Sequence, residues 1–173
     1  MRLTRIEAEA AVLDAQRRAL ATLRVDGQVL PALLLFPPPD APTKNPARIS
    51  LAGGVASDRA KDMSMATVRM FAHAAGVAGA ITVMEAWVAK PSPVIAGDMP
   101  GLAHILPPSQ DPQRGEAIIV AWEFRCAEAP ETKWIGLWQQ RFRREGESIM
   151  PEHAETWDGP TFACEGRFTG LVA

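Results

Sequence analysis

The 173-residue sequence contains no tyrosine, two cysteines and three histidines, and aromatic residues make up 6% of it. Cys126 and Cys164 are 38 positions apart and form no Cys-x-x-Cys motif, which excludes a disulfide framework. No apolar run approaches the roughly 18 residues of a membrane span. The first twenty residues contain charged side chains throughout, so they do not resemble a signal peptide. We therefore expect a cytoplasmic protein without a membrane partner.

The sequence also lacks a large excess of charge of either sign: it has 18 basic and 20 acidic residues, which gives a net charge of −2. This balance gives no reason to expect nucleic acid as a partner. The one basic run, Arg141, Arg143 and Arg144, is typical of a solvated strand end. Arginine outnumbers lysine 14 to 4 and there are 29 alanines, a bias that suggests a GC-rich bacterial genome.

Common catalytic and phosphate-binding motifs are absent as well: the sequence has no GxGxxG, GxxxxGK[ST], HExxH or GxSxG. The three histidines, His73, His104 and His153, are 31 and 49 positions apart, so none of them forms a local metal-binding pair. We expect no cofactor and no tight transition-metal site.

Two helices are predicted. Thr4 to Glu7 fits a capping box, and a helix over about 5–24 ends at Asp26-Gly27. Its packing stripe is predicted from apolar residues at helical spacing, namely Ile6, Ala10, Leu13, Leu20 and Leu23. The second helix, over about 58–75, ends before Gly76 and has its own stripe, namely Ala60, Met63, Ala66, Met70, Phe71 and Ala74.

Strands are predicted near 28–36, 48–51, 80–88, 116–125 and 134–143. The last three should be contiguous, and the last two should be antiparallel neighbours because their connection is short. A proline- and glycine-rich loop is expected over 90–115. The fold class is thus α+β: residues 1–144 form a single domain in which a mostly antiparallel four- to five-stranded sheet has two helices packed on one face.

Residues 145–173 differ from the rest, with spaced glycines and widely separated aromatic side chains. We expect an extended C-terminal tail packed on its own domain or on a second copy of the chain. Apolar residues on both faces of the preceding strands favour the homodimer, since two helices cover one face well and the other poorly.

The weak catalytic candidates are Glu85, His104 and Glu123. Glu85 shares a strand face with apolar residues, and a carboxylate there is costly unless it is paired or protonated. Three interpretations of Glu85 remain open. It forms a structural ion pair, for which Glu123 and Arg125 lie on a strand expected to be near; it is an exposed acid at the rim of the sheet; or it is a catalytic or ligand-binding acid. His104 lies in the predicted long loop and could act as a base.

The run Glu85-Ala86-Trp87-Val88, the loop Pro108-Ser109-Gln110-Asp111-Pro112-Gln113-Arg114 and the strand end Trp122-Glu123-Phe124-Arg125 resemble a loosely defined group of uncharacterised bacterial and phage-associated proteins. In that group the strand ends "SEAW" and the loop reads "PSxxPDR"; here Met84 replaces the serine and Gln113 the aspartate. The resemblance covers about residues 58–144. It implies a compact α+β domain and no activity.

Two functions remain. The leading hypothesis is a non-enzymatic binding or assembly protein of a bacterium or phage, supported by the lack of a catalytic motif and by the long loop and aromatic tail. The alternative is a small hydrolase that uses Glu85, His104 and Glu123 at the mouth of the long loop. The sequence identifies no ligand or substrate.

Overall fold

The computed structural model describes residues 2–51, 58–88, 115–158 and 170–172. Most of the loop predicted over 90–115 lies outside these ranges. Eight elements occur in the described residues, in the order α1 (Arg5–Asp26), β1 (Ala32–Phe36), β2 (Ala47–Ser50), α2 (Asp58–Ala74), β3 (Gly79–Val88), β4 (Gly115–Arg125), β5 (Lys133–Glu145) and β6 (Ser148–Asp158). Neither helix in this part of the chain is long and apolar enough to cross a membrane.

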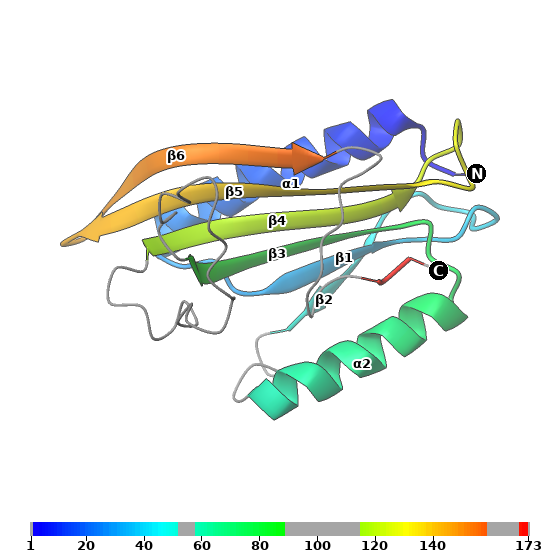
Figure 1. Cartoon of the computed structure of the whole chain (residues 1–173), viewed down its shortest axis with the longest axis horizontal. Coiled ribbons are helices and arrows are strands. Elements are labelled where there is room, and N and C mark those ends of the chain that lie inside the picture. Colours follow the sequence, from blue (N-terminus) through cyan, green and yellow to red (C-terminus); the bar gives the residue numbers. More distant parts are fainter. Residues whose placement is uncertain (1, 52–57, 89–114, 159–169, 173) are drawn as a thin grey trace, which may run out of the picture.

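The six strands form one antiparallel sheet in the order β2-β1-β3-β4-β5-β6 (Figure 1). The predicted α+β class is confirmed, and so is the contiguity of β3, β4 and β5, with β4 and β5 as antiparallel neighbours. Within the described ranges the sheet has six strands rather than four or five. The additional strand, β6, comes from the segment predicted as an extended tail, and the two-residue turn between Glu145 and Ser148 joins it to β5. Gly146 occupies that turn at φ 61°, a conformation that glycine adopts without strain.

One face of the sheet packs against α1 and is called the α1 face. Its core contains most of the large aromatic side chains, namely Phe36, Trp122, Phe124, Trp134, Trp138 and Phe142. Two of the rings lie over glycines of neighbouring strands: a Cβ atom on Gly79 would lie 2.1 Å from Phe124, and one on Gly136 would lie 2.2 Å from Trp122. Glycine is therefore required at both positions for close packing.

The helix presents small side chains to this aromatic layer, and its buried residues are Ala8, Val12, Ala15, Ala19 and Leu23. The predicted packing stripe is correct for Leu23, which is 1% exposed, and for Leu20, which packs against this core, but it is wrong for Ile6 and Leu13, which are 76% and 49% exposed. The reason is steric. Because the sheet side chains fill the space between the layers, alanine at three of the five buried positions lets the helix approach closely.

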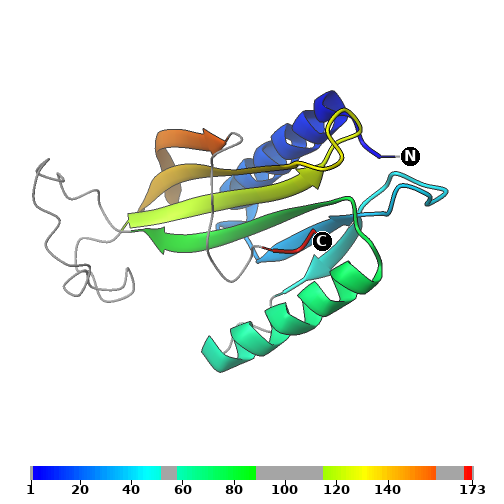
Figure 2. The same ribbon diagram turned by 45° about the vertical axis from the view of Figure 1, so that its right-hand side comes forward.

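The opposite side, called the α2 face, packs against α2 near β1 and β3. The alternation of side chains places Leu33, Leu35 and Ala80 on this face, where a second cluster forms with Leu51, Met65, Ala72, Val77, Leu171 and Val172. The two helices thus lie on opposite sides of the sheet and not on one face as predicted (Figures 1 and 2). Residues 170–172, called the docked segment, lie between α2 and the strands.

Candidate functional site

Glu85 lies at the edge of the α1 face, beside the C-terminal end of α1. One carboxylate oxygen accepts a hydrogen bond from the backbone N–H of Val29 at 2.9 Å, and the other forms an ion pair with Arg144 at 2.6 Å. The Glu85 side chain is 22% exposed. The expectation of a partly buried, paired carboxylate thus agrees with the structure, but the partner is Arg144 of β5 rather than Arg125.

Arg144 links several groups at this corner. Besides Glu85 it contacts the carboxylate of Glu116 at 3.1 Å, and it donates to the carbonyl oxygen of Gly27, the C-cap of α1. Desolvation lowers the pKa of Arg144, but the hydrogen bonds and charges of Glu116 and Glu85 outweigh this and raise it above its usual value. The arrangement satisfies both carboxylates and ties the end of α1 to the sheet.

Glu123 is 5% exposed and belongs to the α2 face, opposite Ala80 in the register. Its carboxylate accepts three consecutive backbone N–H groups of the docked segment: those of Gly170, of Leu171 at 3.0 Å and of Val172 at 3.2 Å. Backbone donors thus provide the charge-assisted hydrogen bonds that a buried carboxylate needs.

The two candidate acids are therefore separated by the sheet. Residues at alternate positions point to opposite faces, and Glu85 pairs with Ile118 while Glu123 pairs with Ala80. One small substrate cannot contact both carboxylates, so the structure does not bring Glu85 and Glu123 together as the hydrolase alternative requires. His104 lies outside the described residues.

Other reactive side chains are engaged or isolated. Burial raises the pKa of the Cys126 thiol, which makes it a poor nucleophile at neutral pH. His153 is exposed and lies 3.2 Å from Glu155 on β6. Within the described ranges, no group of three His, Cys, Asp or Glu residues is arranged to hold a metal ion.

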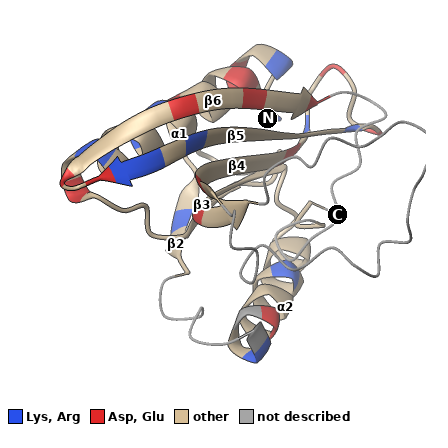
Figure 3. Ribbon diagram, turned by 60° about the vertical axis from the view of Figure 1, so that its left-hand side comes forward, with Lys and Arg blue, Asp and Glu red and all other residues tan. Residues whose placement is uncertain are grey.

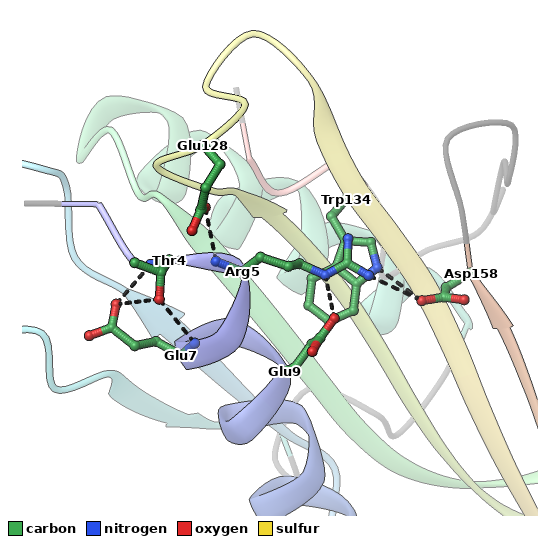
Figure 4. A network of polar contacts seen from close by, with 7 residues as sticks. All are labelled: Thr4, Arg5, Glu7, Glu9, Glu128, Trp134 and Asp158. Carbon is green, nitrogen blue, oxygen red and sulfur yellow. Dashed lines mark hydrogen bonds and ion pairs between the residues drawn. The ribbon is translucent and has the colours of Figure 1, made fainter.

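A polar network surrounds the N-terminus of α1 (Figure 4). The guanidinium of Arg5 lies over the ring of Trp134, 3.6 Å from its centroid, and forms ion pairs with Glu9 at 2.7 Å and with Asp158 at 3.5 Å. The indole N–H of Trp134 donates to the same Asp158 carboxylate at 3.1 Å. The first turn of α1 is thereby attached to β5 and to the end of β6.

The predicted capping box is also present at this end. The Thr4 hydroxyl accepts from the Glu7 N–H at 3.2 Å, and Glu7 accepts from the Thr4 N–H at 2.7 Å. Lys44, in the β1–β2 connection, contacts the other Glu7 oxygen at 2.6 Å. The hydrogen bond from Lys44, followed by the one from the Thr4 backbone, lowers the pKa of Glu7 to about 2. Each of these groups has a partner within the protein, so this network holds the N-terminal end of α1 in place.

The side of α2 that faces away from the sheet is different. Met63, Met70 and Phe71 are 63%, 69% and 58% exposed, whereas Met65 and Ala72 on the inner side are buried. The stripe predicted to pack in the core is thus the outer surface of this helix, here called the outer α2 stripe. Three large apolar side chains on two helical turns exceed the scattered single exposures that are normal at a protein surface.

The sequence could have indicated this orientation only in part. Met65, Val68 and Ala72 also follow helical spacing, so α2 has apolar residues on two sides. Periodicity alone cannot tell which of two apolar stripes contacts the sheet. A signal for the Glu123 contacts is absent too, because their donors are backbone groups 47 to 49 positions away.

No family model, no curated protein and no solved structure matches this chain. The resemblance through the Glu85–Val88 and Pro108–Arg114 motifs therefore stands on those motifs alone.

Proposed function

We propose that this chain is a non-enzymatic assembly protein that forms a homodimer through the outer α2 stripe. The observation on which this rests is the exposure of Met63, Met70 and Phe71 on one side of a single helix. Burying a large apolar side chain gains roughly 1.5–3 kcal/mol. A second copy of the chain offers the same stripe, which makes the interface self-complementary about a two-fold axis.

The spacing of the stripe suits antiparallel pairing of two α2 helices. With the axis between Ala66 and Thr67, Met63 of one copy faces Met70 of the other, and the small residues at the crossing point allow close approach. The Thr67 hydroxyl already donates to the carbonyl of Met63 at 3.0 Å, so its burial leaves no unpaired donor. Antiparallel pairing also brings the N-terminal end of each helix dipole near the C-terminal end of the other.

The charges of the described surface support a protein partner rather than nucleic acid. Figure 3 shows basic residues at the end of β5 with acidic residues close by. Arg144 is paired with Glu85 and Glu116, and Arg143 with Glu145 at 3.0 Å. We propose a cytoplasmic protein of a bacterium or phage, because the sequence lacks a membrane span and a signal-peptide pattern, because its composition suggests a GC-rich bacterial genome, and because its motifs resemble a phage-associated group. The hydrolase alternative is not favoured, because Glu85 and Glu123 lie on opposite faces.

The oligomeric state of two matched variants tests this proposal. Light scattering coupled to size exclusion should give a dimer for the unaltered chain, and Met70→Glu should weaken dimerisation by at least about tenfold in Kd, because a carboxylate is placed in the interface. Val25→Glu is the control: Val25 is 83% exposed on α1, so this variant should remain dimeric. A monomeric unaltered chain, or a Met70→Glu variant that dimerises normally, would refute the proposal.

A further inference from the structure

Residues 170–172 are held in an unusual way. Ionisable side chains from three elements contact their main chain: the Glu123 carboxylate accepts the three N–H groups, Lys133 donates to the carbonyl of Val172, and Nε2 of His73 lies 2.9 Å from the carbonyl of Gly170. The docked segment belongs to none of the strands of the sheet. Detaching it would therefore break no β-ladder hydrogen bond.

The apolar contacts of the segment are equally specific. Leu171 is 1% exposed and Val172 is fully buried, and both lie in the cluster with Leu33, Leu35 and Met65. Gly170 has φ 72°, a conformation that disfavours side chains larger than glycine. A segment that fits this position needs a glycine followed by two medium-sized apolar residues.

Without an occupant, this position would be costly for the protein. The Glu123 carboxylate would lose all three donors, and the apolar residues around Leu171 and Val172 would be uncovered. A buried acceptor without a partner and a bare apolar surface both favour rebinding of a segment. The Glu123 carboxylate binds main-chain N–H groups, which every peptide carries, so the segment that supplies them does not have to belong to the same chain.

We propose that His73, Glu123, Lys133 and the adjoining apolar cluster form a peptide-recognition site, which residues 170–172 fill in cis. The ligand class is a short peptide with a Gly-Leu-Val-type sequence and three consecutive free N–H groups, supplied by another protein chain in exchange for the docked segment. This site lies on the inner side of α2, so the proposal does not depend on dimerisation through the outer α2 stripe.

The test uses full-length chains and a synthetic peptide with the sequence of residues 167–173. Leu171→Asp weakens the docked segment, and this variant should bind the peptide with one-to-one stoichiometry and at least about tenfold more tightly than the unaltered chain, because the competing segment is removed. Adding Glu123→Gln to Leu171→Asp should weaken binding at least about tenfold, because one charge-assisted acceptor is lost. A control peptide with valine in place of its glycine should not bind.

Three results would overturn the proposal. The first is a folded Leu171→Asp chain that does not bind the peptide, and the second is binding that Glu123→Gln leaves unchanged. The third is a Leu171→Asp chain that unfolds, since the segment would then be an integral part of the core. As an independent measurement on the unaltered chain, the ¹⁵N-labelled amide signals of Gly170, Leu171 and Val172 should shift as unlabelled peptide is added. Signals that stay in place at saturating peptide would contradict exchange between the two segments.

Discussion

The two faces of the sheet are completed by different means. The α1 face is covered by one continuous helix, which is capped by Thr4 and Glu7 at one end and attached through Gly27 to Arg144 at the other. The α2 face is covered by a helix that buries only its inner side and by the docked segment, which has no regular secondary structure. The comparison teaches that the two faces of one small sheet can be closed by different means, one by a capped helix and the other by a helix together with a short segment bound through its main chain.

The largest expected difference between the faces is in core stability. Phe124 is 1% exposed and packs against Phe36, with ring centroids 5.0 Å apart, so Phe124→Ala should lower the free energy of unfolding by about 3–5 kcal/mol. Leu171→Ala on the α2 face should cost at most about 2 kcal/mol, because the docked segment can detach locally. Urea denaturation measures both. Equal losses would show that the two faces are equally integral to the fold.

A side chain added at a glycine should lower stability where the glycine lies under an aromatic ring of the α1 face. Gly136→Ala places a methyl group 2.2 Å from the Trp122 ring and should cost about 1–3 kcal/mol. Among the described residues, Gly115→Ala in the same sheet would meet Val88 at 4.0 Å and no closer neighbour, and it should change stability by less than about 1 kcal/mol. The melting temperatures of the two variants give the comparison. If Gly136→Ala has the same melting temperature as the unaltered chain, the close packing of Trp122 on Gly136 does not determine stability.

The attachment of α1 at its C-terminal end depends on Glu85. Glu85→Gln should cost about 1–3 kcal/mol, because the ion pair with Arg144 loses its charge. Glu116→Gln should cost less, since Arg144 keeps Glu85 and since Glu116 is 32% exposed. Denaturant titration separates the two. Unchanged stability together with a loss of binding or activity would instead identify Glu85 as a functional acid.

The attachment of α1 at its N-terminal end should depend on pH. The pKa of Glu7 is lowered to about 2 in the folded chain from a usual value of 4.5, so its contribution to stability is present above pH 4.5 and is lost as the pH falls toward 2. Glu7→Gln should therefore melt at a lower temperature at neutral pH, and the gap to the unaltered chain should close between pH 4.5 and 2. A gap that is constant over this range would exclude the contacts with Lys44 and Thr4 as its cause.

Local patterns were sufficient to predict the capping box, both helices and the five strands β1 to β5. They were not sufficient for β6, where Pro151 and a nearly continuous run of exposed residues give no apolar period. They also placed Ile6 and Leu13 of α1 and the outer α2 stripe in the core, because the side of a helix that packs depends on the layer opposite it. The aromatic rings around Trp122 select alanines from α1, and this is a property of the assembled sheet.

The candidate site was less accessible to prediction. A carboxylate on an apolar row of β3 indicates a buried ion pair at Glu85, but its partner Arg144 is 59 positions away, in a basic run that is typical of a solvated strand end. Glu123 is a weak catalytic candidate from the sequence and a possible neighbour of Glu85, whereas in the structure it binds main-chain N–H groups, and no residue type specifies such donors. The chemistry of a side chain can be predicted from the sequence. Hydrogen bonds from a distant backbone segment to that side chain cannot, because every residue except proline carries the same N–H donor.

The central claim is that two copies of the chain meet through the outer α2 stripe, and a distance between the copies tests it most directly. A nitroxide label on Ala75→Cys, in a chain with both native cysteines replaced by alanine, places one spin per copy on an exposed residue just past the end of α2, outside the crossing point. With the two-fold axis between Ala66 and Thr67, the two labelled positions lie roughly 25 Å apart along the antiparallel helices, so we expect a dipolar coupling that corresponds to about this distance. A dimer without this coupling, or no dimer at all, would contradict the account.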